Sequence, residues 1–178
     1  MLEQLRTAYG KRFLKKAILR PKKIDTLSFD AIRKCVVVID EAALNVGKVH
    51  DTVKILEAAN SAMNIHFVSY AKKPNDNTTL PIEQLETMYR NDLNWYFRPR
   101  QMSIGVCDLL IDLTTAPVLP LQLLTALSNA TLKVGVDQPW NREVLNLMIQ
   151  SKDPVEIDRI TEQLVKYINM IKKGKNAA

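Results

Sequence analysis

Short apolar runs alternate with helix-like patterns along this chain, and the most continuous run lies at residues 108–114. Its sequence, DLLIDLT, is almost continuously apolar, which is typical of a strand covered on both faces of a sheet. Ile111 lies inside this run, so we expect it to be fully buried at the sheet centre. A helix-like pattern over 119–130 and a second apolar run over 132–136 follow directly. Together these segments predict a strand–helix–strand unit.

The first half of the chain shows the same alternation. Residues 35–39 (CVVVI) and 65–71 are rich in β-branched and aromatic side chains, and a helix-like pattern over 49–63 separates them. Strands that alternate with helices form a parallel sheet with helices on both of its faces. The pattern therefore predicts an α/β fold, a three-layer Rossmann-like sandwich with a mostly parallel sheet of five to six strands.

Three further segments are less regular. Residues 80–90 are expected to hold a short helix that starts at Pro81. Residues 93–97 (LNWYF) are expected to form a short aromatic strand that ends before Pro99. Residues 143–150 are expected to add an edge strand, antiparallel to its predecessor. With 93–97 counted as the third strand, right-handed crossovers favour the strand order 3-2-1-4-5.

The N-terminal segment has a helical pattern with a single apolar stripe. The stripe consists of Leu2, Leu5, Tyr9, Phe13 and Ala17. Gly10 weakens the middle of this helix by about 1 kcal/mol relative to Ala, and Pro21 ends it. We expect residues 1–24 to form a basic amphipathic helical extension and residues 25–178 to form a single α/β domain.

A second amphipathic helix is expected to close the chain, starting at residues 153–154. Its expected buried side consists of Val155, Ile157, Ile160, Leu164, Tyr167, Ile168 and Ile171. Such a stripe is wide enough to pack against a sheet or another helix.

Composition places the chain among ordinary globular proteins, with 47% hydrophobic and 25% charged residues. No apolar run approaches the roughly 20 residues needed to cross a bilayer. Basic residues interrupt the N-terminus where a signal peptide would have its apolar core, so the expected location is the cytoplasm. Cys35 and Cys107 each precede an apolar run, which indicates buried free thiols rather than a disulfide.

The net charge of +6 is concentrated at one end of the chain. Residues 1–23 hold eight Lys or Arg against Glu3 alone, so this segment carries +7 and the remainder −1. The basic character therefore belongs to the N-terminal helix, and it is weak evidence for nucleic-acid binding by the domain.

The expected winding of the sheet reverses between the strands at 35–39 and 108–114, and open α/β sheets bind ligands at such a reversal. The ligand-binding candidates there are Asp40, Asn45, Lys48, Asp112, Thr114 and Thr115. Two close carboxylates, at Asp40 and Asp112, would bind a divalent cation or share a proton. The alternative is that each accepts hydrogen bonds from neighbouring amides.

Recognised catalytic and cofactor motifs are missing from the sequence. Gly47 and Lys48 lack the other residues of a phosphate-binding P-loop, and there is no dinucleotide or GxSxG motif. His50 and His66, the two histidines, have no ligand-spaced partner for a metal. We therefore predict no catalytic residue, no metal site and no cofactor.

A mixture of rings and cations makes residues 95–100 (WYFRPR) a candidate partner surface, because rings stack on bases or protein surfaces beside cations. The alternative is an edge strand with one ring inward and one outward. The partner-surface candidates are Trp95, Arg98, Arg100, Lys11, Arg12 and Lys15.

Two resemblances complete the sequence analysis. The segment DLLIDLTTAPVLPLQLLTALSNATLKVGV resembles the strand–helix–strand of the acceptor-side half of heptosyltransferase-type glycosyltransferases, but EAALNVGKVHD stands where a glycine-rich loop would follow the first strand. The basic start, VVVID, LNWYFRP, DLLIDL, LKVGV and EQLVKYINMI, in this order, resemble a bacterial family of short uncharacterised α/β proteins. The second resemblance implies the single-domain fold and no particular activity.

The leading functional hypothesis is a non-enzymatic binding or interaction module. One alternative is a small enzyme, or a degenerate relative of one, that binds a phosphorylated or sugar-like ligand between Asp40 and Asp112. Another is a peripheral membrane or nucleic-acid binder acting through residues 1–23. A protein partner or self-association is favoured over nucleic acid or membrane. We also favour docking of the N-terminal stripe on its own domain or on a neighbouring subunit over cover by a membrane or an acidic partner.

Overall fold

A computed structural model gives the architecture of the chain. It describes residues 2–18, 27–40, 45–73, 84–100, 106–150 and 156–175, and all structural statements below concern these residues. No helix within these ranges is long and apolar enough to cross a membrane. The expected boundary between the extension and the domain, at residue 24, lies outside them.

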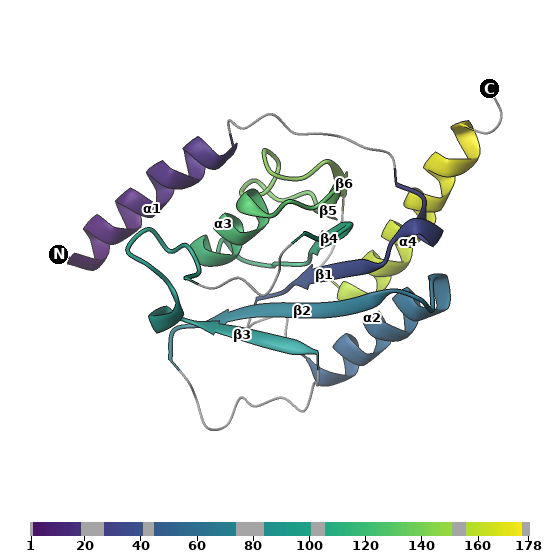
Figure 1. Cartoon of the computed structure of the whole chain (residues 1–178), viewed down its shortest axis with the longest axis horizontal. Coiled ribbons are helices and arrows are strands. Elements are labelled where there is room, and N and C mark those ends of the chain that lie inside the picture. The colour runs from purple at the N-terminus through teal and green to yellow at the C-terminus, as the bar shows by residue number, and fades with distance from the viewer. Residues whose placement is uncertain are drawn as a thin grey trace.

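The described residues form one six-stranded sheet in which all neighbouring strands are parallel (Figure 1). The strands are β1 (Lys34–Val38), β2 (Asn64–Ala71), β3 (Leu85–Tyr89), β4 (Leu109–Asp112), β5 (Leu132–Val136) and β6 (Leu147–Ile149), in the order β3-β2-β1-β4-β5-β6. The helices are α1 (Leu2–Ile18), α2 (Val46–Ala59), α3 (Leu119–Leu127) and α4 (Ile157–Lys175). The predicted three-layer Rossmann-like fold is confirmed.

The helices cover the two faces of the sheet in pairs, with α2 and α4 on one face and α1 and α3 on the other (Figure 1). β1 and β4 lie side by side at the centre, with Val37 opposite Ile111. Ile111 is 1% exposed, as the apolar run predicted. Since both faces of this strand pair are covered, nearly every side chain on it has to be apolar.

The third strand is β3, so the helix predicted at residues 80–90 is wrong. Residues 85–89 (LETMY) form the strand at one edge of the sheet, and Met88 is the one buried side chain of this strand. Cross-strand pairs hold β3 to β2: His66 contacts Glu86 at 3.1 Å, and Ser69 Oγ lies 3.0 Å from Thr87 Oγ1. An edge strand that buries a single side chain carries few apolar residues, so its pattern does not distinguish it from a short helix.

The aromatic strand predicted at residues 93–97 is also wrong, because this segment is a turn. The side-chain oxygen of Asn94 accepts hydrogen bonds from the backbone amides of Tyr96 (2.9 Å) and Arg98 (3.1 Å). Such a side-chain turn reverses the chain locally. Phe97 has φ 62°, in the left-handed region that a strand cannot use.

The predicted edge strand exists as β6, but its predicted antiparallel direction is wrong. Residues 141–144 form turns, and the chain then runs back beside β5 in the parallel sense, with Val134 opposite Leu147. The side chain and amide of Asn146 both bond to the backbone of Lys133, at 2.9 and 2.7 Å, and these bonds bring the two strands together. The turns thus bring the chain back to the start of β5, so that β6 pairs with β5 in the parallel direction.

α1 forms where it was predicted, but it buries a different face. Its buried residues are Arg6, Gly10 and Ala17. Leu2, Leu5 and Tyr9, which the stripe placed inward, are 72%, 49% and 49% exposed. Docking of these three side chains on their own domain is therefore wrong, whereas their cover by a neighbouring subunit stays a prediction.

Close packing explains the choice of face. A Cβ on Gly10 would lie 2.8 Å from the Phe97 ring and 2.9 Å from Leu119, so only glycine lets the helix approach this closely. The Arg6 guanidinium lies 4.4 Å from the centre of the Phe97 ring and donates to the carbonyl of Asn94 at 2.9 Å. The turn at residues 94–98 thus forms part of the surface on which α1 packs.

α4 packs largely as predicted, with Ile157, Ile160, Leu164 and Ile168 buried. Tyr167, expected on the buried side, is exposed, so this part of the prediction is wrong. The buried residues of α4 recur every three or four positions and form one stripe that packs against the core, and Tyr167 lies off this stripe. Val155, the side chain of Ile171 and the helix start predicted at 153–154 lie outside the described residues.

Truncation of Ile111 tests the central position of β4. Ile111→Ala is expected to lower the free energy of unfolding by about 2–5 kcal/mol, because it leaves a cavity between covered faces. Denaturant titration measures this loss. A loss below about 1 kcal/mol would contradict burial in a core that cannot collapse.

Gly10→Ala sets helix propensity against packing. Propensity alone would stabilise α1 by about 1 kcal/mol, whereas pushing Phe97 and Leu119 apart costs about 1–3 kcal/mol. We expect a net loss of stability in thermal and denaturant unfolding. Gly47→Ala is the matched control, because the nearest atom to its Cβ is 3.4 Å away. A Gly10 variant at least as stable as the wild type would contradict the close approach.

Candidate functional site

Asp40 lies just beyond the end of β1, and its carboxylate is held by the loop that precedes α3. It is 2% exposed and accepts hydrogen bonds from the backbone amides of Thr115 (2.6 Å) and Ala116 (2.7 Å). The Thr115 hydroxyl donates to the same carboxylate at 2.9 Å. These donors point to where an external anion would bind in an open α/β sheet, and here the anion is Asp40 itself.

Asp112 ends β4 and is held by a separate set of donors. It is also 2% exposed, and one of its oxygens accepts from the amide (3.0 Å) and hydroxyl (2.7 Å) of Thr114. The other oxygen accepts from the Thr125 hydroxyl of α3 at 3.2 Å. The indole of Trp140 donates to the Thr114 hydroxyl at 3.4 Å.

Burial raises the pKa of Asp112 above its usual value, and the negative charge of Asp40 raises it further. The hydrogen bonds from Thr114 and Thr125 act in the opposite direction without cancelling the effect of burial. Gly135, opposite Asp112 on β5, leaves no room for a side chain, because its Cβ would meet the Asp112 carbonyl. The site is therefore buried and tightly packed.

Each of the two carboxylates is thus held by its own set of donors, which is the alternative to a cation site or a shared proton; Thr114, Thr115 and Ala116, from the segment between β4 and α3, supply most of them. Within the described ranges, no group of three or more His, Cys, Asp or Glu side chains is placed to hold a metal ion. The sequence correctly brings Asp40, Asp112, Thr114 and Thr115 to one edge of the sheet. Their side chains are hydrogen-bonded to one another or to backbone amides of the same edge, and ligand binding by them stays a prediction.

Asn45 and Lys48 lie at the start of α2. The side chain of Asn45 caps this helix and accepts from the amides of Gly47 (3.0 Å) and Lys48 (3.4 Å). The first donors of α2 are therefore satisfied by the chain itself. Residues 41–44, which connect Asp40 to Asn45, lie outside the described residues.

The two cysteines are free and buried. Burial raises the pKa of Cys35 and raises that of Cys107 to about 11. At neutral pH both are thiols rather than thiolates, so they lack the reactive form of a cysteine nucleophile.

A second candidate region, the α1 platform, combines the outer side of α1 with the turn that seats it. We define it by its exposed apolar and basic side chains. The apolar members are Leu2, Leu5, Tyr9, Trp95 and Tyr96, and the basic members are Lys11, Arg12, Lys15, Lys16, Arg98 and Arg100. All six partner-surface residues predicted from the sequence are exposed and belong to it.

Internal contacts hold the platform together. The ring of Phe13 in α1 lies 5.9 Å from that of Tyr96 in the turn. Glu3, the single acid of α1, pairs with Arg90 at 3.2 Å. The outer cations of α1 therefore face solvent beside an acid that is already paired.

Sequence reasoning missed Leu2, Leu5 and Tyr9 as surface residues. The available signal was the pair of small residues at Gly10 and Ala17, two turns apart on one face. Small side chains at this spacing mark the face on which a helix approaches its neighbour most closely, and so they indicate which flank stays outside.

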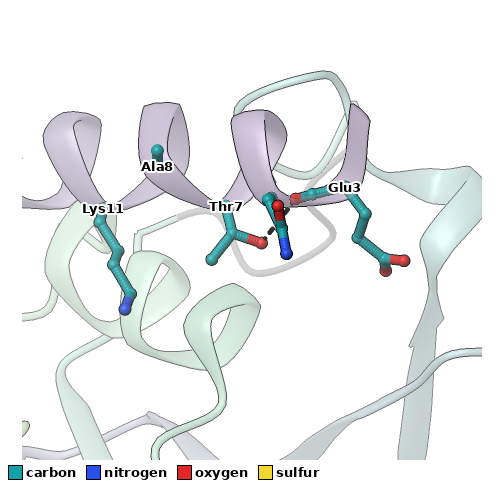
Figure 2. Close-up of a pocket in the computed structure, with 5 residues that line it drawn as sticks. Glu3, Thr7, Ala8 and Lys11 are labelled. Carbon is teal, nitrogen blue, oxygen red and sulfur yellow. Dashed lines mark hydrogen bonds between the residues drawn. The ribbon is translucent and has the colours of Figure 1, made fainter. Parts of the chain in front are cut away.

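A shallow depression lies along α1 and shares Lys11 with the α1 platform (Figure 2). It has a volume of about 330 Å³ and is lined by Glu3, Gln4, Thr7, Ala8 and Lys11. Thr7 donates to the Glu3 carbonyl at 2.9 Å, a contact within the helix. None of the lining side chains is buried, so the depression has no desolvated polar group to fix a small ligand.

Asp112→Asn tests the buried carboxyl. Because its folded-state pKa is raised above the unfolded value of about 3.9, the wild type loses stability as the pH rises from about 4 through the folded-state pKa. Asparagine stays neutral, so the variant is expected to gain stability relative to the wild type across this window. Denaturant unfolding at a series of pH values measures the difference, with the exposed Asp51→Asn as the control. Parallel curves for wild type and Asp112→Asn would contradict the shift.

A family model described as a family of unknown function, DUF6913, matches residues 6–171. No curated protein and no solved structure matches the chain. The resemblance to heptosyltransferases stays a prediction, whereas the match spans α1 from Arg6 through most of α4. The chain therefore belongs to the DUF6913 family of unknown function.

Proposed function

We propose that this protein is a non-catalytic binding module whose recognition surface is the α1 platform. One contrast carries the proposal. The polar groups at the carboxyl edge of the sheet are used internally, whereas the cations and rings of the platform face solvent. A surface that binds a partner keeps its charged and apolar groups accessible in this way.

The charge of the platform selects an anionic partner. Lys11, Arg12, Lys15 and Lys16 are all exposed, and Glu3 is engaged by Arg90. Exposed cations interact weakly one at a time, but several on one rigid surface attract a polyanion together. The docked helix holds them in place before a partner arrives, which lowers the entropic cost of binding.

The platform also explains why a basic helix is attached to a nearly neutral body. Arg6 holds α1 on the turn at residues 94–98, because its guanidinium lies over the Phe97 ring and donates to the Asn94 carbonyl. The remaining cations of α1 contribute nothing to the core. The proposed interaction with an anionic partner gives these exposed cations a role outside the chain.

Heparin, a soluble polyanion, is the probe for this surface. Replacing Lys11, Arg12, Lys15 and Lys16 by Glu is expected to weaken heparin binding at least about tenfold, because each exposed ion pair contributes up to about 1 kcal/mol. Titration at low and high salt measures the affinity, and the wild-type affinity is expected to fall as salt rises.

The matched control reverses four exposed lysines on other elements, Lys54, Lys72, Lys73 and Lys166. It changes the net charge equally and is expected to keep most of the heparin binding. Asp112→Asn is also expected to bind heparin as the wild type does. Equal losses in both charge-reversed proteins would mean that net charge alone is responsible and would overturn the proposal.

A further inference from the structure

We propose that the anionic partner of the α1 platform is a lipid surface, on which α1 lies flat in the headgroup region. This inference rests on the proposed function and specifies its partner. Leu2, Leu5 and Tyr9 would enter the boundary between headgroups and acyl chains, and the neighbouring cations would contact anionic headgroups.

The apolar flank of α1 carries this inference. Leu2, Leu5 and Tyr9 follow the three- and four-residue spacing of one helix flank and stay exposed although the helix is docked. Phe13 continues the flank by one turn, and its contact with Tyr96 adds a ring from the turn. The exposed apolar surface therefore spans two segments of the chain.

The side chains fit an interface between water and lipid. Tyr and Trp, here Tyr9, Tyr96 and Trp95, place a ring in the apolar boundary and a polar group in the headgroups. Lysine and arginine stems extend along apolar surface while their charges reach the phosphates. Arg12 follows Tyr9 by three residues and Lys16 follows Phe13 by three residues, so both cations lie beside the apolar flank of the helix.

Other occupants use only part of this surface. A second copy of the chain would bring the same cations against each other, and the acid of α1 is already paired with Arg90. A nucleic acid would contact the cations and stack on the rings, but it would leave Leu2 and Leu5 in water. A lipid surface satisfies the cations, the rings and the leucines together.

The docking of α1 removes the usual cost of such an interaction. A free helix of this length is marginal in water and has to fold on the membrane. Here the contacts of Arg6 with Asn94 and Phe97, and the close approach at Gly10, hold the helix in advance. The preformed flank compensates for its modest apolar area.

Co-sedimentation of the full chain with phosphatidylcholine vesicles, with or without phosphatidylglycerol, tests the inference. The wild type is expected to bind the vesicles that contain phosphatidylglycerol and not those of phosphatidylcholine alone. Leu2→Ser with Leu5→Ser is expected to weaken binding about tenfold. A single change of Lys11, Arg12, Lys15 or Lys16 to Gln is expected to weaken vesicle binding about fivefold.

Two variants separate insertion from structure. Met148→Ser with Met170→Ser removes exposed apolar side chains from β6 and α4 and is expected to leave binding unchanged. Leu5→Trp is expected to bind more tightly than the wild type, because tryptophan favours the interface. A merely structural role of Leu5 would not produce such a gain.

The outcomes distinguish the two proposals. Heparin binding without vesicle binding, or tighter binding to single-stranded RNA than to vesicles, would overturn the lipid surface and leave the binding module standing. Vesicle binding that is unchanged in the serine variant would also overturn it. A wild type that binds neither heparin nor the phosphatidylglycerol vesicles would overturn both proposals.

Discussion

The double burial of β1 and β4 is the constraint on which the rest of the structure depends. With both faces of these strands covered, a polar group at their ends has to find its partner inside the protein. Asp40 and Asp112 stand at these ends, and each is met by threonine hydroxyls and backbone amides from the segment between β4 and α3. The central core and the closed edge of the sheet are thus two results of one constraint.

Because the carboxylates at this edge of the sheet are hydrogen-bonded within the protein, the proposed binding surface lies on α1 and the turn that contacts it. α1 rests on α3 and on the turn at residues 94–98, and the turn exists because Asn94 folds the chain back and Phe97 adopts a left-handed conformation. Phe97 then receives both the guanidinium of Arg6 and the bare backbone of Gly10. A local turn therefore decides which side of a basic helix faces solvent.

The proposed binding surface has a consistent electrostatic logic. Arg6 is held within the fold by a ring and a carbonyl, and Glu3 is paired with Arg90, so α1 offers its remaining cations outward. The apolar flank beside them has no covering element among the described residues. Charge supplies attraction over the Debye length, and the flank supplies short-range affinity.

The sequence by itself determined the α/β class, the four central strands, the positions of the four helices and the placement of Asp40 and Thr115 at one edge of the sheet, because continuous apolar runs and alternating elements allow few topologies. Only the tertiary structure decided the edge strands, the role of the carboxylates and the exposed flank of α1. β3 buries one side chain, Met88, so its pattern is weak, and the direction of β6 depends on turns. The face of α1 was decided by a close approach at Gly10, where the absence of a side chain outweighs the apolar stripe.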